Sequence, residues 1–302
     1  MTHGTVSAVR VPDGCGDHEG MTSTSRRTVL TALATAAVSG PLLGGVAASP
    51  AYATDEFDLY TSNTDLYTKL AGKEGIDFAR RYKRHEHLDS SLGERYPYHR
   101  TTIMAMHGGG IETGTSELCL GIAGYHPATL APLQDGYGSH DYWMFEGLRS
   151  SNNRELHVTA KNNDDHVAIS MAAGSLNVLS LHGCTAAQAG TANPQAVVVG
   201  GLNERFKTLL KTEFGKAGIA WRDGNDPEVR DLAGVNPDNP CNRTMLAKGG
   251  QLELTTELRA AMFSVNTRAG RAGSTTEVYD RFVRACRAAI ATLEKDADQV
   301  IL

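Results

Sequence analysis

The chain has 302 residues, with 29 Lys and Arg against 34 Asp and Glu, a formal net charge of −5. A mildly acidic chain without a long basic run is a poor nucleic-acid binder, so we expect no nucleic-acid partner. The sequence also shows no heptad pattern and no internal repeat, which are the marks of coiled coils and repeat arrays.

The N-terminal 53 residues have the composition of a targeting segment. Residues 1–20 show no periodicity, and we interpret them as a non-translated or disordered extension. Residues 21–53 resemble a twin-arginine signal peptide, with Arg26 and Arg27 before a mildly apolar run and an A-x-A cleavage signature ending at Ala53. The run is short and rich in Ala and Gly for a transmembrane helix, and a membrane-anchoring segment is the alternative. We therefore expect a secreted bacterial protein, exported folded, without a stable membrane anchor in its mature form.

Residues 54–302 form the predicted mature domain, and their length fits one α/β domain with a sizeable core. Four cysteines remain in this part, Cys119, Cys184, Cys241 and Cys286, and none has C-x-x-C spacing, which argues against a structural zinc knuckle. Secretion permits disulfides, but the sequence does not choose among the three pairings. Cys119 and Cys286 lie on apolar helix faces, where buried thiols are the alternative.

Strand-like and helix-like segments alternate along the mature chain, which predicts an α/β fold. Residues 54–100 are expected to form short helical or irregular pieces. Predicted strands cover residues 103–106, 142–147, 156–159, 177–182, 197–200, 219–221 and 251–254. Predicted helices cover residues 118–124, 164–173, 202–218, 255–263 and 278–293, and residues 224–240 are predicted to form a loop.

A glycine-rich loop follows the first predicted strand, in the order His107, three glycines, Ile111 and Glu112. Consecutive glycines occur where the backbone takes unusual dihedrals or a ligand approaches closely. A spacing of five does not place two side chains on one helix face, so the loop must fold back to bring His107 and Glu112 together. Two His and one Glu are common ligands of a catalytic zinc that keeps a position for water. Alternatives are a solvated glycine turn, or a phosphate loop, although the Gly-Lys-Ser/Thr ending is absent.

The predicted strand at residues 177–182 repeats this design, because it also ends in a histidine followed by glycine, His182 and Gly183. Ligands gather at the carboxyl ends of strands in open α/β sheets. His107, Glu112 and His182 are therefore predicted to bind one zinc ion, although a lone His182 could be a hydrogen-bonded interior residue. A second histidine cluster, residues 85–87, is interpreted as solvated surface.

Glu253 is the candidate catalytic residue. It lies in a short predicted strand on which Leu252 and Leu254 point one way and Gln251 and Glu253 the other. Beside a zinc ion such a carboxylate can take a proton from water and pass it to a leaving amine. The alternative is a strand carboxylate paired with an arginine. Arg243, which with Asn242 ends the loop 224–240, could hold a substrate carboxylate or be an ordinary surface residue.

At this point the sequence resembles the poly-γ-glutamate hydrolases of phage and bacterial origin. The resemblance covers about residues 100–259. The matching motifs are His107-Gly-Gly-Gly-Ile-Glu112, Gly114-Thr115-Ser116-Glu117, Phe145-Glu146-Gly147-Leu148, Leu156-His157-Val158-Thr159, Leu181-His182-Gly183-Cys184, Gly200-Gly201-Leu202 and Gln251-Leu252-Glu253-Leu254.

This resemblance implies a fold similar to that of zinc carboxypeptidases, a mixed sheet flanked by helices on both faces, with one zinc per chain. His107, Glu112 and His182 match the zinc ligands of the family, and Glu253 matches its catalytic glutamate. Arg243 and Asn242 are proposed to bind substrate from charge alone. The implied substrate is an acidic polymer or γ-glutamyl peptide, and we expect a monomer.

Two features distinguish this chain from the pattern of the family. It carries an export signal and about fifty mature residues before the first match, and its loops at 126–140 and 223–240 could shape a different cleft. A peptidoglycan amidase or peptidase, and a non-catalytic secreted binding domain, are therefore the alternative functions.

Overall fold

The computed structural model describes residues 58–85 and 101–299. The chain divides into two units, Met1–Val46 and Ala47–Leu302, and every described residue belongs to the second. The predicted extension 1–20 and signal peptide 21–53 lie outside the described residues, as do Glu86 and His87.

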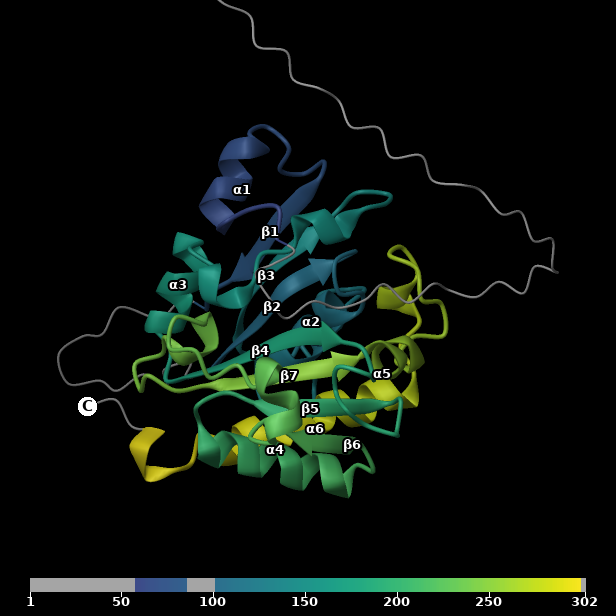
Figure 1. Cartoon of the computed structure of the whole chain (residues 1–302). Helices are drawn as coiled ribbons and strands as arrows, with labels where there is room; N and C mark the ends of the chain where they lie inside the picture. The colour runs from purple at the N-terminus through teal and green to yellow at the C-terminus, as the bar shows by residue number, and fades with distance from the viewer. Residues whose placement is uncertain (1–57, 86–100, 300–302) are drawn as a thin grey trace, which may run out of the picture. The chain divides into compact units, whose positions relative to one another are not determined.

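One mixed sheet of seven strands, in the order β1-β3-β2-β4-β7-β5-β6, organises this unit (Figure 1). The strands are β1 (Phe78–Lys83), β2 (Thr101–Gly109), β3 (Asp141–Gly147), β4 (Asn177–Cys184), β5 (Ala196–Gly200), β6 (Ala220–Asp223) and β7 (Gly250–Thr255). The four central strands β3, β2, β4 and β7 are parallel, whereas β1 is antiparallel to β3 and β5 is antiparallel to β7. The predicted single α/β domain with a mixed sheet is confirmed.

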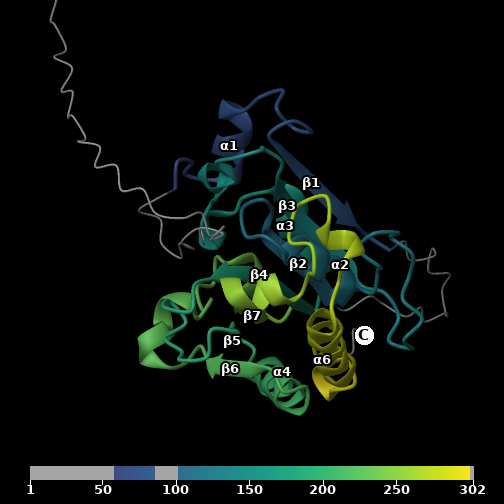
Figure 2. The ribbon, with the colours of Figure 1, turned by 90° about the vertical axis from the view of Figure 1, so that its right-hand side faces the viewer.

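Helices cover both faces of the sheet (Figure 2). They are α1 (Asn63–Lys69), α2 (Thr115–Ala123), α3 (His166–Ala173), α4 (Glu204–Lys216), α5 (Thr256–Ala261) and α6 (Glu277–Leu293). None of the helices in the described ranges is both long enough and apolar enough to cross a membrane.

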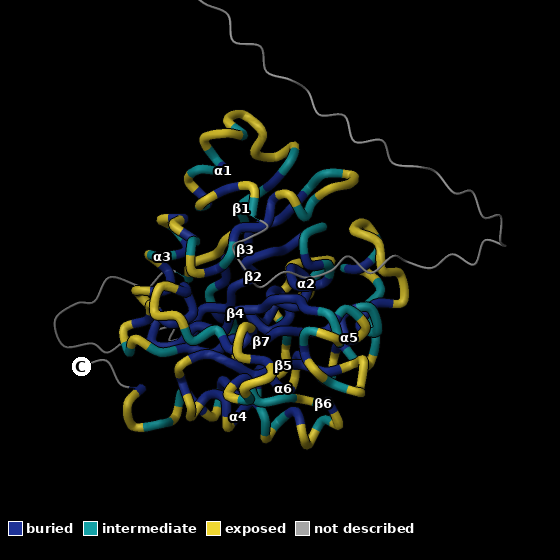
Figure 3. Tube along the Cα trace, in the orientation of Figure 1, coloured by how far each residue is buried: buried dark blue, intermediate teal, exposed yellow. Residues whose placement is uncertain are grey.

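Alternating side chains of the strands build a separate core on each face. Ile103 and Ala105 of β2 join the apolar side chains of α2, α4 and α6, where Phe214 and Phe282 stack at 5.0 Å between ring centroids. Met104 of β2 joins instead the core under α1 and α3. Figure 3 shows the inner strands of the sheet as buried, whereas the edge strands β1 and β6 are largely intermediate or exposed. A period of two in side-chain direction explains how one strand supplies both cores.

Two predictions about secondary structure were wrong. The edge strand β1 was not predicted, because its Arg80, Arg81 and Lys83 hide the apolar alternation, as charged residues on edge strands commonly do. The strand predicted at 156–159 is instead the end of a 3-10 helix, Asn153–Leu156, followed by extended chain without a sheet neighbour. Leu156 and Val158 are both buried in a core. Their alternation with polar residues therefore results from burial of an extended segment that pairs with no described strand.

The four cysteines of the described residues are buried and unpaired. The interpretation of Cys119 and Cys286 as buried thiols on helices is confirmed, since both side chains lie in the core with α2 and α6. Burial raises the pKa of each of these two thiols well above its usual range, which keeps them protonated and unreactive.

We expect Phe282→Ala to lower the free energy of unfolding by about 3–5 kcal/mol, because it removes a fully buried ring and leaves a cavity beside Phe214. Met245→Ala is the control, because that side chain is 51% exposed, and it should change stability by less than about 0.5 kcal/mol. Urea unfolding monitored by circular dichroism measures both. Equal effects would mean that the face of α6 does not carry the core.

Candidate metal centre

The triple-glycine loop folds back on the end of β2. The Glu112 N–H donates to the carbonyl oxygen of His107 at 2.8 Å, which closes a tight turn. Gly109 has a φ of +65°, and a Cβ there would collide with the carbonyl of Gly147 on the neighbouring strand β3. The loop therefore needs glycine both for its backbone conformation and for the close approach of β3.

His107 and His182 present the same ring nitrogen to each other. Their Nδ1 atoms are 3.2 Å apart, and the Nδ1 of His107 is 3.0 Å from Oε1 of Glu112. Ligands at about 2.0–2.1 Å around a tetrahedral zinc ion are about 3.3 Å from one another. The distances from His107 to His182 and to Glu112 therefore fit ligands of one zinc ion, although the possible ligand atoms that all lie within 4.8 Å of one another belong to His107, Glu112 and His157.

Hydrogen bonds with the backbone fix the side chains of His107 and Glu112. The Nε2 of His107 donates to the carbonyl oxygen of Val158 at 2.9 Å, which leaves Nδ1 as the atom available to a metal. The N–H of Gly183 donates to Oε2 of Glu112 at 2.8 Å. Such outer hydrogen bonds orient metal ligands and set their basicity.

The sheet brings Glu253 beside this cluster. His182 of β4 and Glu253 of β7 are paired residues in adjacent parallel strands, so their side chains project from the same face. Gln251 donates from Nε2 to Oε1 of Glu253 at 3.0 Å. The structure thus brings together His107, Glu112, His182 and Glu253, all of them less than a tenth exposed.

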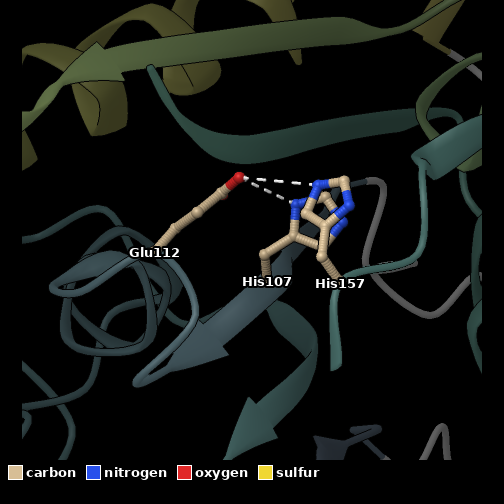
Figure 4. Close-up of side chains that lie close together, drawn as sticks. All are labelled: His107, Glu112 and His157. Carbon is tan, nitrogen blue, oxygen red and sulfur yellow. Dashed lines mark hydrogen bonds and ion pairs between the residues drawn. The ribbon is translucent and has the colours of Figure 1, made fainter. Parts of the chain in front are cut away.

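A third histidine, His157, completes the cluster and was not assigned a role from the sequence (Figure 4). Its ring lies over that of His107, with 4.0 Å between centroids, and its Nε2 is 4.0 Å from Oε1 of Glu112. His107, Glu112 and His157 each offer a possible ligand atom, all within 4.8 Å of one another. His157 lies in the motif 156–159. It neither ends a strand nor precedes a glycine, which are the two features that identified His107 and His182 as candidate ligands.

Burial and mutual charge perturb every titratable group of the cluster. Burial alone would raise the pKa of Glu112, but the neighbouring His107 outweighs it and the pKa is about 2. Burial and then His107 lower the pKa of His182 to about 3, so its imidazole is neutral and able to bind a metal. Burial, together with the charge of Glu112, raises the pKa of Glu253 well above its usual range. Opposed shifts of this kind cluster at functional sites.

The cluster forms the wall of a cavity of about 370 Å³. His107, Glu112, His157, His182 and Glu253 all line it. Its other lining side chains are polar or charged to a large extent and include Lys161, Gln188, Arg230, Asp231, Asn236 and Asn239.

Asn242 and Arg243 do not line this cavity. The buried amide of Asn242 donates to the carbonyl oxygens of Gly234 and Asn236, at 2.8 and 2.9 Å, and so supports the loop that does line it. Arg243 is exposed at the surface. Their substrate-binding role stays a prediction that the geometry does not favour.

A model of the poly-gamma-glutamate hydrolase family matches residues 81–285, more than half of the chain. The chain belongs to this family. In Bacillus subtilis (strain 168), the SPbeta prophage-derived protein YoqZ is 31% identical over 184 residues, and protein YndL is 28% identical over 185. These alignments cover 61% and 60% of this chain, and only 59% and 63% of the two relatives, so the chain spans under two thirds of their length.

Solved structures of poly-gamma-glutamate hydrolase relatives share the fold. The structure of a bacteriophage poly-gamma-glutamate hydrolase aligns with a TM-score of 0.63 and 26% identity, over 78% of this chain and 98% of that one. A zinc-free apo structure of YndL aligns with a TM-score of 0.60 at 24% identity, over 77% of this chain and 97% of that one. The predicted family and fold class are confirmed.

We expect His182→Ala to lower the zinc affinity of the chain by at least roughly a hundredfold, because it removes one of the three predicted ligands. His166→Ala is the control, since His166 is an exposed histidine at the start of α3. Competition with a chromophoric chelator measures both dissociation constants. Unchanged affinity in His182→Ala would show that the β4 histidine is not a ligand.

Proposed function

We propose that this chain is a secreted zinc-dependent hydrolase that cleaves γ-glutamyl amide bonds, with poly-γ-glutamate as its substrate. The observation that carries the proposal is the convergence of two imidazole Nδ1 atoms 3.2 Å apart, the Glu112 carboxylate and the buried Glu253 in one cavity. Family membership and the likeness to the bacteriophage enzyme support the reaction class.

Zinc is the proposed cofactor, one ion per chain, held by His107, Glu112 and His182. The Nδ1 spacing and the neutral state of His182 support this choice, as does the description of the YndL structure as zinc-free. Bound there, zinc supplies a Lewis acid that polarises the amide carbonyl and makes a water molecule nucleophilic near neutral pH.

Glu253 is the proposed general base and acid. Its carboxylate takes a proton from the attacking water as the new C–O bond forms, and delivers that proton to the departing nitrogen as the C–N bond breaks. Burial and the negative Glu112 raise the pKa of Glu253, and a metal ion held by the cluster would oppose the effect of Glu112. Glu253 is thereby tuned toward the range in which it can both accept and return a proton.

Arg230 and Lys161 are the cavity-lining cations suited to the substrate, because each residue of poly-γ-glutamate keeps a free α-carboxylate. Both side chains are exposed, so they can reach an incoming polymer. Arginine binds carboxylates bidentately, which fixes the orientation of the chain as well as attracting it. We therefore assign recognition of the substrate carboxylate to Arg230 in place of Arg243.

Export by the twin-arginine route and a monomeric state are part of the same proposal. The sequence of residues 21–53 supports export. The four buried, unpaired thiols support a protein that does not depend on disulfide formation outside the cell.

Glu253→Gln should lower kcat on poly-γ-glutamate by about 10²–10⁴-fold while zinc affinity is retained, because the amide cannot accept the proton. Released amines report the activity, and Glu257→Gln, an exposed neighbour on α5, is the control. Chelation of zinc should abolish activity in the unaltered chain. Release of muropeptides in place of glutamate would favour the peptidoglycan alternative, and an inactive parent chain would favour a binding domain.

Arg230→Ala should raise KM for poly-γ-glutamate by roughly tenfold and leave kcat nearly unchanged. The arginine would stabilise the bound substrate and the transition state equally, so its loss weakens binding without slowing the chemical step. Arg243→Ala is a matched control, an exposed arginine outside the cavity. Initial rates across polymer concentrations separate KM from kcat. A larger KM effect in Arg243→Ala would restore the role predicted from the sequence.

A further inference from the structure

Asp58 lies outside the segment that the family model covers, yet it contacts His157 of the candidate metal centre. The model matches residues 81–285, whereas Asp58 precedes α1. Asp58 nevertheless accepts a hydrogen bond from Nδ1 of His157 at 2.7 Å, and its side chain is 5% exposed. We propose that His157 is a further donor to the bound metal ion, which would then have four protein donors and take the reacting water as a fifth ligand, and that Asp58 is the residue that positions His157.

The hydrogen bond determines which nitrogen of His157 can bind a metal. A carboxylate only accepts hydrogen bonds, so Nδ1 carries the proton and the lone pair of the neutral ring is on Nε2. That nitrogen is 4.0 Å from Oε1 of Glu112 and belongs to the set of possible ligand atoms within 4.8 Å. A histidine whose second nitrogen is held by a carboxylate is a common arrangement around zinc.

Asp58 also holds the backbone that follows His157. Its Oδ2 accepts a hydrogen bond from the N–H of Thr159 at 2.6 Å, so both carboxylate oxygens are used. Between these two residues, the carbonyl of Val158 accepts the hydrogen bond of His107. The short segment 157–159 therefore touches His107 twice, by the tilted ring of His157 and by this carbonyl, and Asp58 accepts hydrogen bonds from His157 and Thr159 on either side of it.

The segment that contains Asp58 and α1 is held to the rest of the domain by hydrogen bonds, so Asp58 can position His157. The Thr64 N–H donates to Asp164 at 2.8 Å, and the Tyr67 hydroxyl donates to Asp165 at 2.9 Å. Both contacts join the α1 region to the start of α3. Asp58 is thus fixed with respect to residues about a hundred positions later in the chain.

The test is a double-mutant cycle on the full chain, with the zinc dissociation constant as its readout. His157→Ala should weaken zinc binding by at least tenfold, and Asp58→Asn by about tenfold. The double variant should lose clearly less affinity than the product of the two single losses, because Asp58 acts on the metal mainly through His157. Asp65→Asn is the control, since Asp65 pairs with Lys69 in the same segment. Losses that multiply in the double variant, or affinities within twofold of the parent in both single variants, would overturn the proposal.

A second measurement needs no variant that could fail to fold. Long-range ¹H–¹⁵N spectra of the ¹⁵N-histidine-labelled chain resolve the two nitrogens of each imidazole. Added zinc should shift the resonance of Nε2 of His157 and leave its Nδ1 protonated, whereas an unaffected Nε2 would overturn the assignment.

The inference rests on the metal centre of the proposed function and not on its substrate. A chain that binds zinc through His157 without cleaving poly-γ-glutamate would refute only the function, and cleavage with an unaffected His157 would refute only this inference.

Discussion

A buried carboxylate that requires a positive charge is the constraint on which the rest of the site depends. Glu112 is 6% exposed and stays ionised, and a buried anion is tolerated only when it is paired and hydrogen-bonded. The Gly183 N–H supplies one hydrogen bond, the rings of His107 and His157 lie beside Oε1, and the buried Arg259 interacts with the same negative charge. Burial opposes a proton on His107, yet Glu112 raises the pKa of His107 above its usual value. A divalent cation meets the same need while letting the imidazoles stay neutral.

The sheet topology explains how these groups converge. The adjacent parallel strands β2, β4 and β7 end at one edge, so His107, His182 and Glu253 arrive from three strands without long loops. β2 carries one extra residue relative to β3 between Ala105 and Gly108, and this changes which face the following side chains take. Strict alternation would place His107 on the face of Ala105, away from His182.

The residues at strand ends or in strands, and Glu112 in the glycine loop after β2, could be predicted from the sequence, whereas His157 and Arg230 in other irregular segments could not. Glu253 was visible because Leu252 and Leu254 alternate with it, and His182 because an apolar run ends in His-Gly. His157 lies in extended chain that imitates a strand, and Arg230 lies in a 3-10 helix within the predicted loop. Arg243 was selected for its charge, together with its neighbour Asn242. The sequence does not reveal that the Asn242 amide donates to carbonyl oxygens of its own loop, at Gly234 and Asn236. Predictions from periodicity therefore find the residues on strands and miss those that long-range hydrogen bonds position.

Asp58 also connects the site to the proposed removal of an N-terminal signal. The predicted cleavage site ends at Ala53, and Asp58 follows five residues later. Cleavage at that point keeps the carboxylate that orients His157, whereas cleavage a few residues further on would remove it together with its bond to Thr159. A processed chain that keeps the contacts of the segment 157–159 with His107 and Asp58 would have to begin before Asp58. Under the proposed export, the contacts of Asp58 would therefore limit where the signal could be removed.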